Sequence, residues 1–211
     1  MKQIYKTRAL FAALLLLLLS ATSCEDFLEA PLPPDKITTD KVYGAKGTIE
    51  MAMVGVYSKA SNYYGSGSLI QTTEELADNL NYNPPTNIDV LANSEYDASN
   101  STGLDQLWTS SYAAIFQANN MLQSLPAETA NLTDAETDQY TAENLFLRAL
   151  MYFELVRMYG DVPLILTTDP KETQSVPRTP KADVYAAIIA DLKDVMTRLP
   201  ETNIDGLDAR R

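Results

Sequence analysis

Histidine is absent from this chain of 211 residues, and Cys24 is its single cysteine. Without imidazole, the Ser-His-Asp and Cys-His nucleophilic systems and most zinc sites are excluded. Without a second cysteine no disulfide forms within the chain, so the fold depends on its apolar core. Carboxylate chemistry of the kind that glycosidases use remains open, because the chain has 28 aspartates and glutamates.

Positive charge is also scarce, since the chain has only 16 lysines and arginines against 28 acidic residues, which gives a net charge of −12. This argues against nucleic acid, which needs a basic footprint, and against electrostatic docking onto anionic lipid. Residues 65–68 (GSGS) lack the flanking strand and the lysine that a phosphate-binding loop requires. The sequence therefore predicts no nucleic-acid partner, and it indicates neither a cofactor nor a metal.

Residues 1–23 have the composition of a signal peptide. Three basic residues precede an apolar run from Leu10 to Leu19, which is shorter than the roughly 20 residues of a membrane-spanning helix. Small residues then lead to Cys24, a pattern similar to bacterial lipoprotein signals, in which this thiol is acylated. The alternative is an ordinary secretory signal with an incidental cysteine. We expect residues 24–38, acidic and then proline-rich, to form an extended tether.

Apolar residues at three- and four-residue steps predict four main helices in the remaining domain, residues 39–211. Their expected ranges are 40–60, interrupted near Gly44 and Gly47, then 104–125, 133–159 and 180–199. Because no pair of strands is evident, the fold class is all-α: tetratricopeptide-like antiparallel helix pairs with long irregular loops. The last helix is expected to bury one stripe, formed by Tyr185, Ile188, Leu192, Val195 and Leu199.

Helix ends are also predicted from local patterns. Thr133 and Glu136 have the spacing of a capping box, and Gly160 suits the left-handed position that ends a helix. Thr179 before Pro180 has the form of an N-cap followed by an N1 proline. Asp161 either binds a metal or, as we favour, caps amides in its own turn.

Several residues have two interpretations each. Trp108 is either a platform on which a sugar stacks or, as its apolar stripe favours, a core residue. Arg148 either works with Glu143 or Glu154 in catalysis or, as we favour, is a buried arginine paired with a helix carboxylate. Three further aromatic residues are predicted to lie in the core: Tyr152, Phe153 and Tyr159.

Residues 61–103 change character and are rich in Asn, Tyr, Ser and Pro. Long loops without periodicity often carry function, and this one has the amides, carboxylates and rings that saccharide recognition uses. The alternative is a solvated loop with some tyrosines packed down. The candidate ligand-binding residues are Asp78, Asn79, Tyr82, Asn83 and Tyr96.

Several segments, taken in order, resemble the SusD/RagB-like nutrient-binding lipoproteins of the outer membrane of Bacteroidetes. They include residues 24–28 (CEDFL), 107–109 (LWT), 147–149 (LRA), 159–164 (YGDVPL) and 177–178 (PR). The resemblance implies an α-helical, non-catalytic protein. It also implies a lipid anchor at Cys24, exposure at the cell surface, and delivery of glycans or peptides to a SusC-like TonB-dependent transporter.

Members of this family are two or three times as long as this chain, so we expect an incomplete, N-terminal part of the domain. The leading hypothesis is a surface protein that captures an oligosaccharide by stacking and hydrogen bonding. The rival hypotheses are a helical-repeat protein that binds peptide or protein ligands for the same kind of transporter, and a carboxylate-based glycosidase.

Overall fold

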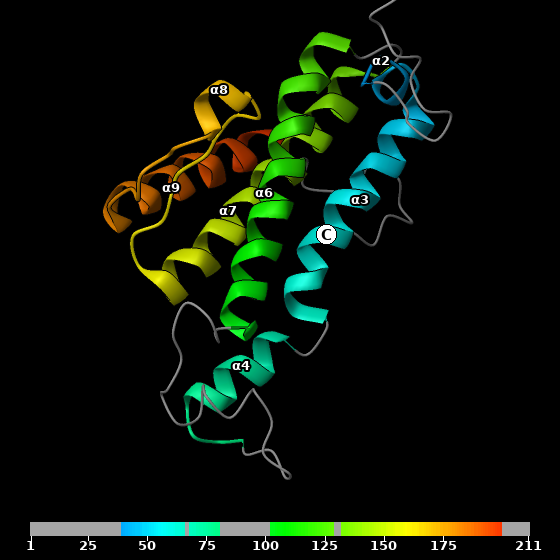
Figure 1. Ribbon diagram of the computed structural model, residues 1–211. Coiled ribbons are helices and arrows are strands. Elements are labelled where there is room, and N and C mark those ends of the chain that lie inside the picture. Colours follow the sequence, from blue (N-terminus) through cyan, green and yellow to red (C-terminus); the bar gives the residue numbers. More distant parts are fainter. Residues whose placement is uncertain (1–38, 66–67, 81–101, 129–131, 200–211) are drawn as a thin grey trace, which may run out of the picture. The chain divides into compact units, whose positions relative to one another are not determined.

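The computed structural model describes residues 39–65, 68–80, 102–128 and 132–199. The predicted all-α class is confirmed within them (Figure 1). The helices are α2 (Thr39–Tyr43), α3 (Lys46–Gly65), α4 (Ser68–Leu76), α6 (Thr102–Glu128), α7 (Asp134–Tyr159), α8 (Pro170–Thr173) and α9 (Lys181–Arg198). Within these ranges, extended backbone pairs at a single antiparallel bridge, which joins Val162 and Thr179.

Helix α7 packs antiparallel to both α6 and α9, as the sequence predicts. The start of α6 meets the end of α7, and the start of α7 meets the end of α9, while mid-helix residues join all three. The bonds that fix these directions run from Tyr159 Oη to the Leu104 carbonyl (2.6 Å), from Arg148 to Asn119 and Asp191 (2.8 Å each), and from Arg198 to Asp138 (2.7 Å).

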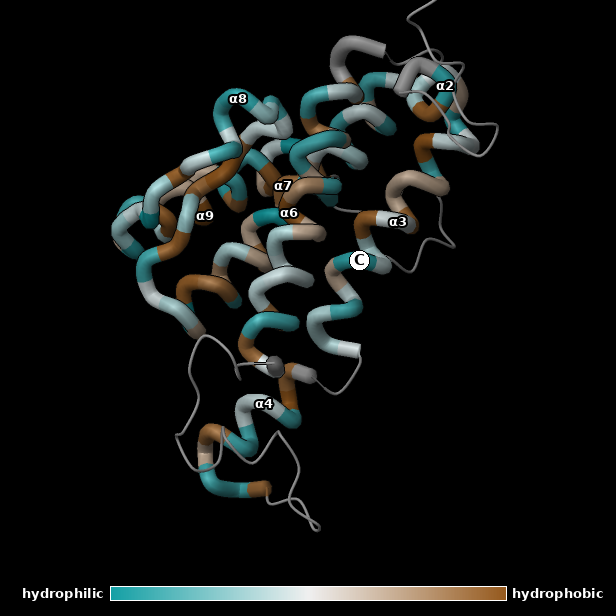
Figure 2. Tube along the Cα trace, viewed as in Figure 1, coloured by the Kyte–Doolittle hydropathy of each residue, from teal (hydrophilic) through white to brown (hydrophobic). Residues whose placement is uncertain are grey.

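Helix α3 runs in the same direction as α7 and contacts both α6 and α7. Tyr57 donates to Glu143 at 3.0 Å and Tyr64 donates to Glu154 at 3.2 Å, so the residue numbers increase in the same direction along both helices. Hydrophobic and hydrophilic residues alternate along α3 and α9 (Figure 2). The core lies between these helices and contains, fully buried, Ile49, Met53, Tyr63, Leu107, Ile115, Met121, Leu125, Met151, Tyr152 and Leu155.

The predicted ends of α7 are confirmed. The Thr133 hydroxyl accepts from the Glu136 amide, and the Glu136 carboxylate accepts from the Thr133 amide at 2.9 Å, so two otherwise free amides are satisfied. At the other end, Gly160 has φ of 71° and donates its amide to the Val156 carbonyl at 3.1 Å. This backbone conformation is open to glycine and costly for other residues.

Other predicted boundaries are wrong. Helix α6 continues past Pro126 to Glu128, and α3 continues to Gly65, beyond the expected end at residue 60. Pro180, and not Thr179, is the N-cap of α9, because its backbone is still extended (ψ of 136°) while its carbonyl accepts from the Val184 amide at 3.2 Å. The Asp161 carboxylate accepts from the Lys181 amide at 2.8 Å, so this side chain caps α9 and not its own turn.

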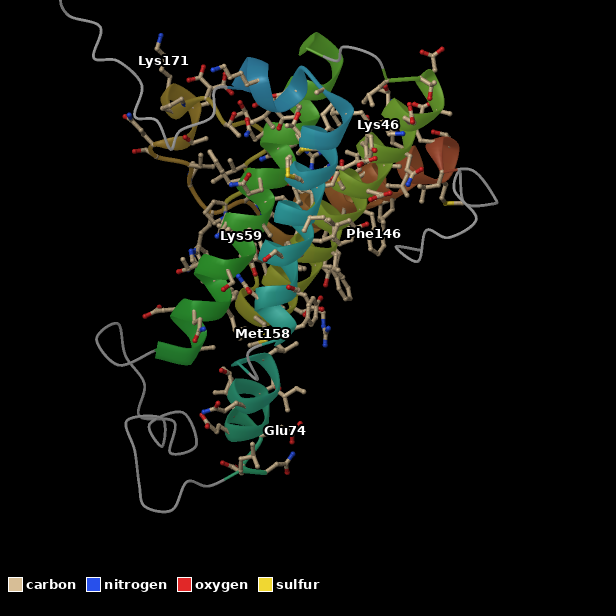
Figure 3. The ribbon with its side chains drawn as sticks, turned by 90° about the vertical axis from the view of Figure 1, so that its right-hand side faces the viewer. Lys46, Lys59, Glu74, Phe146, Met158 and Lys171 are labelled. Atoms are coloured by element: carbon tan, nitrogen blue, oxygen red, sulfur yellow. The ribbon has the colours of Figure 1, made fainter. Side chains whose placement is uncertain are left out.

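The predicted buried stripes need correction on two helices. Phe153 was expected in the core, yet its side chain is 39% exposed, and Phe146 is 45% exposed on the same face of α7 and points outward (Figure 3). On α9 the buried stripe contains Val184, Ile188 and Val195. The exposed stripe of α9 contains Tyr185 and Leu192, which were predicted to be buried, and also Ile189 and Met196.

Candidate ligand-binding site

The predicted loop site is only partly within the described residues. Asp78 and Asn79 lie directly after α4 and are exposed. Tyr82, Asn83 and Tyr96 lie outside the described residues, as does the predicted lipidation site, Cys24.

Asp78 and Asn79 complete the C-terminus of α4, and Glu74 in the last turn of that helix is labelled in Figure 3. The Asn79 amide bonds the Glu74 carbonyl at 2.8 Å, and the Asp78 amide bonds the Glu75 carbonyl at 3.1 Å. Asp78 has φ of 58°, so these bonds form a Schellman motif with an aspartate in the left-handed position. Asn79 Nδ2 also donates to Glu74 Oε2 at 2.8 Å. Both residues thus have a structural role, and their role in ligand binding stays a prediction.

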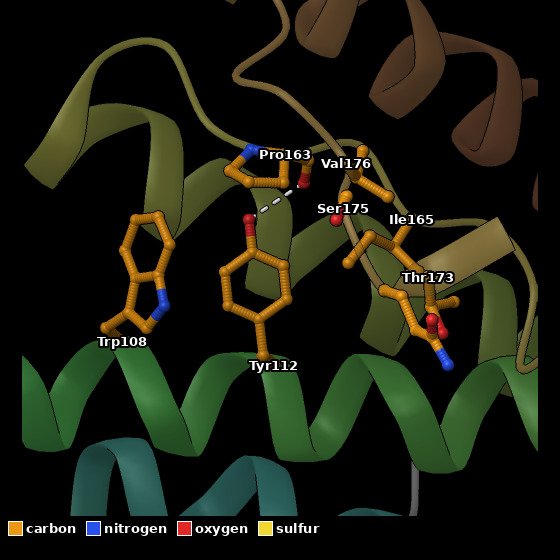
Figure 4. Close-up of a pocket in the computed structure, with 8 residues that line it drawn as sticks. Trp108, Tyr112, Pro163, Ile165, Thr173, Ser175 and Val176 are labelled. Atoms are coloured by element: carbon orange, nitrogen blue, oxygen red, sulfur yellow. Dashed lines mark hydrogen bonds between the residues drawn. The ribbon is translucent and has the colours of Figure 1, made fainter. Parts of the chain in front are cut away.

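A pocket of about 250 Å³ lies beside Trp108, and we call it the Trp108 pocket (Figure 4). Trp108 and Tyr112 contribute to it from α6, one turn apart. The opposite wall comes from the segment after α7 and from α8 with the residues that follow it. These remaining lining residues are Pro163, Ile165, Thr173, Gln174, Ser175 and Val176.

Polar side chains on α6 hold the wall of the Trp108 pocket in place. Tyr112 Oη donates to the Pro163 carbonyl at 2.8 Å, and Asn119 Nδ2 donates to the Ile165 carbonyl at 2.9 Å. These two side chains lie seven residues apart and so share one face of α6. From α7, Tyr152 Oη accepts from the Ile165 amide at 2.7 Å and donates to the Ile165 carbonyl at 2.8 Å. The extended segment after α7 is therefore bonded to two helices.

Aromatic rings cluster at the pocket. The Trp108 ring lies 4.9 Å from that of Tyr112 and 5.1 Å, at 90°, from that of Tyr159, distances at which ring edges and faces attract. The Arg178 guanidinium lies over Trp108, 5.5 Å from the ring centre. Trp108 is half-buried, so it packs against the core, as predicted, and also lines the pocket.

The phenols around the pocket are neutral hydrogen-bonding groups at ordinary pH. Burial raises the pKa of Tyr112 well above its usual value, and the positive charge of Arg178 acts in the opposite direction. Burial likewise raises the pKa of Tyr152, and it raises the pKa of Tyr159 to about 12. Tyr112 and Tyr152 therefore keep the protons that they donate to the wall of the pocket, and Tyr159 keeps the proton that it donates to the Leu104 carbonyl.

The lining of the Trp108 pocket suits recognition without proton transfer. Two rings offer stacking surfaces, while Thr173, Gln174 and Ser175 offer hydroxyl and amide groups. None of the lining residues is a carboxylate. In the part of the chain that the structure describes, no three Cys, Asp or Glu residues cluster as metal ligands, and no helix is long and apolar enough to cross a bilayer.

The carboxylates that the sequence offered for catalysis are held by the core. Glu143 accepts from Tyr57 and from Gln139, the latter at 2.7 Å, and lies 11 residues from Glu154 on the same helix. That spacing separates them by about 16 Å along the axis, beyond the 5–9.5 Å between glycosidase carboxylates. The favoured interpretation of Arg148 is confirmed, because it is a buried arginine paired with a helix carboxylate. That carboxylate belongs to Asp191 on α9, not to Glu143 or Glu154.

Comparison with known proteins places these observations in a family. Residues 26–208 match the model of the SusD-like family, described as starch-binding and associating with the outer membrane. The chain belongs to the SusD-like family. A SusD-like protein of Formosa agariphila is 28% identical over 195 residues, which cover 87% of this chain and 36% of the relative. A SusD-like protein of Bacteroides ovatus is 25% identical, over 98% of this chain and 37% of the relative.

Solved structures agree with this assignment. A laminarin-binding SusD-like protein superposes with a TM-score of 0.65 at 26% identity, over 77% of this chain and 36% of that one. A SusD superfamily protein of Parabacteroides distasonis gives a TM-score of 0.63 at 28% identity, over 80% of this chain and 36% of that one. The chain thus spans about a third of the length of the relatives it matches.

Sequence reasoning about this SusD-like chain missed the Trp108 pocket. It assigned Trp108 to the core and did not single out residues 173–176. One signal was present, because the polar run Thr173-Gln174-Ser175 interrupts otherwise structured sequence between two helices. That signal does not reveal that the run lies opposite Trp108 and Tyr112, about 60 residues earlier in the chain.

Proposed function

We propose that this SusD-like chain is part of a lipid-anchored protein of the outer membrane that binds oligosaccharide and transfers it, without chemistry, to a SusC-like TonB-dependent transporter. The Trp108 pocket carries this proposal, because it combines stacking rings with hydroxyl and amide groups in a family described as starch-binding. The similarity to a laminarin-binding protein supports the same class of ligand. Asp78, Asn79, Tyr82, Asn83 and Tyr96 are proposed to extend the binding surface.

The proposed organisation has three parts. Residues 1–23 are the signal peptide, residues 24–38 the tether from the acylated Cys24, and residues 39–211 the N-terminal part of the helical domain. Incorporation of labelled fatty acid that is lost in Cys24→Ser tests the anchor. Exposure at the cell surface is tested by protease treatment of intact cells, and the transporter partner by co-purification from outer membranes.

Glycan binding is tested on the full chain with laminarin, starch and xyloglucan oligosaccharides. Trp108 is the only tryptophan in the sequence, so its fluorescence reports on this pocket directly. We expect at least one glycan to change the Trp108 emission, and Tyr112→Ala to weaken that binding about tenfold by removing a stacking ring. Phe153→Ala, which removes an exposed ring on α7, is the matched control and should bind normally.

The second hypothesis, a peptide-binding protein for the same kind of transporter, gives a different result. It predicts that no glycan on the panel binds while an unstructured peptide library shows saturable binding. That outcome would overturn the carbohydrate proposal and leave the family assignment intact.

A further inference from the structure

Arg178 differs from the other arginines in the described ranges by its lack of an acidic partner. Arg148, Arg157 and Arg198 each lie within 4 Å of a carboxylate. Arg178 forms no such pair with a described residue, and its hydrogen bond goes from Nη1 to the Asp161 carbonyl at 2.6 Å. The side chain is exposed, so most of its donors face solvent.

The surroundings of Arg178 make this guanidinium unusual in so acidic a chain. It lies over Trp108, and its charge is felt at Tyr112, so it stands beside both rings of the pocket. The nearby Asp161 carboxylate accepts from the Lys181 amide, and no lining residue of the pocket is charged. A positive group therefore stands next to a neutral, aromatic pocket that offers hydroxyl and amide groups.

The chemistry of arginine matches one class of ligand. A guanidinium stacks on an aromatic ring through its face and keeps its in-plane N–H groups free, so it binds a carboxylate through two parallel hydrogen bonds while it remains on the ring. A neutral sugar gains little binding energy from such a pair of charged donors, because it has no carboxylate to accept both hydrogen bonds. A sugar that carries a carboxylate uses both the rings and the charge.

We propose that the Trp108 pocket binds a uronic acid residue, with the sugar ring against the aromatic side chains and the carboxylate on Arg178. This inference rests on the proposed function and narrows its ligand to an acidic oligosaccharide. It assigns Arg178 a role in specificity, in addition to its bond to the Asp161 carbonyl.

Three small probes test the charge by itself: methyl glucuronide, its uncharged methyl ester, and methyl glucoside. Titrated into the full chain and followed by Trp108 fluorescence, the glucuronide should bind about two- to fivefold more tightly than the ester, as expected for an exposed ion pair. Raising the salt concentration should weaken the binding of the glucuronide and not that of the two uncharged probes, because salt screens exposed charges.

Two arginine variants make a matched pair. Arg178→Gln should remove the preference for glucuronide over its ester. Arg157→Gln should keep the preference, although Arg157 is also exposed and lies 5.2 Å from an aromatic ring centre, that of Phe153. Circular dichroism checks the fold of both variants, and the ester comparison in the unmodified chain decides the question if Arg178→Gln does not fold.

Equal affinity for glucuronide and ester would overturn the inference, as would a preference that survives Arg178→Gln. If neutral glycans from the larger panel bind while glucuronide shows no advantage, the inference fails and the proposed function stands. If no carbohydrate of any kind binds, both fail.

Discussion

Removing Arg148 should destabilise this chain more than any exposed substitution, because this arginine joins three helices. Its Nε and Nη2 donate to the two oxygens of Asp191 on α9, and its Nη1 donates to Asn119 Oδ1 on α6, all at 2.8 Å. The Arg148 and Asp191 side chains are only 10% and 14% exposed. Arg148→Met keeps much of the volume and removes the charge and all three bonds.

The magnitude follows from what each substitution leaves behind. Arg148→Met strands a nearly buried carboxylate, and Asp191→Leu strands a nearly buried guanidinium, so each should cost about 3–5 kcal/mol of unfolding free energy. If the costs were additive, the double variant would lose about 6–10 kcal/mol. Removing both charges, however, leaves only Asn119 Oδ1 without its donor, which costs about 1–3 kcal/mol. The double variant should therefore be more stable than either single one.

Arg198 is the matched control, since it also links α9 to α7, through the carboxylate of Asp138. It donates to Asp138 at 2.7 Å and to Asp194 at 2.9 Å, but its side chain is 35% exposed and those of its partners are more so. Solvent screens this pair, so Arg198→Met should cost no more than about 1 kcal/mol. The same chemistry thus gives different costs because burial differs.

Urea unfolding of the full chain, followed by circular dichroism and by Trp108 fluorescence, measures these free energies. Small domains are stable by about 5–15 kcal/mol, so Asp191→Asn, which keeps an acceptor toward Arg148, is a milder variant if Arg148→Met does not fold. Equal costs for Arg148→Met and Arg198→Met, or additive costs in the double variant, would refute the reasoning.

Three further predictions test local features. The pKa of Glu136 is lowered to about 2, chiefly by its hydrogen bond from Lys46, so this group stabilises the fold above its unfolded pKa of 4.5. That stability should be lost as the pH falls from 4.5 toward 2, and urea unfolding should show a shallower loss for Glu136→Gln. Burial raises the pKa of Tyr159 to about 12, so ultraviolet titration of Tyr159→Phe against the unmodified chain should place the missing ionisation about two units above free tyrosine. Gly160→Ala should cost about 1–3 kcal/mol because φ is 71°, whereas Gly55→Ala, mid-helix and equally open, should stabilise by roughly 0.5–1 kcal/mol; thermal melts that show equal effects would contradict this.

Features that depend on a few neighbouring residues were predictable from the sequence. The capping box of Thr133 and Glu136 spans four residues, and the C-terminal glycine of α7 is adjacent to the helix it ends. Both follow from backbone groups that every helix leaves unpaired. The long periodic patterns of α6 and α7 likewise predicted helices, with errors at their ends.

The buried face of α9 was predicted only in part, because apolar residues occupy two adjoining stripes of this helix. Ile188 and Val195 are buried as expected, whereas Tyr185 and Leu192 are exposed. The face of α9 that packs against α7 also contains Asp191, a charged residue that was not part of the predicted apolar stripe. Its carboxylate accepts two hydrogen bonds from Arg148, which lies 43 residues earlier. Such a choice depends on the partner helix, and a single helix does not carry the information.

The Trp108 pocket was hidden for a similar reason. Part of its wall is formed by Pro163 and Ile165, which have no helical periodicity and whose carbonyls accept hydrogen bonds from α6. The rest is formed by residues 173–176. The Asp161 carboxylate, which caps a helix 20 residues later, is a second case in which a polar residue works at a distance. Local pattern therefore predicts helices well and the connections that build sites poorly.

The ion pair at the centre of the helices also bears on the pocket, through Asn119. Arg148 can only donate, so it fixes Oδ1 of the Asn119 amide toward itself and turns Nδ2 toward the Ile165 carbonyl. That bond holds the wall of the Trp108 pocket against α6. Loss of Arg148 frees the amide to turn, and the wall then loses a donor that Tyr152 alone does not replace. Arg148, in the segment that resembles the SusD-like family, does not line the pocket. Through Asn119 it nevertheless positions Ile165, which does.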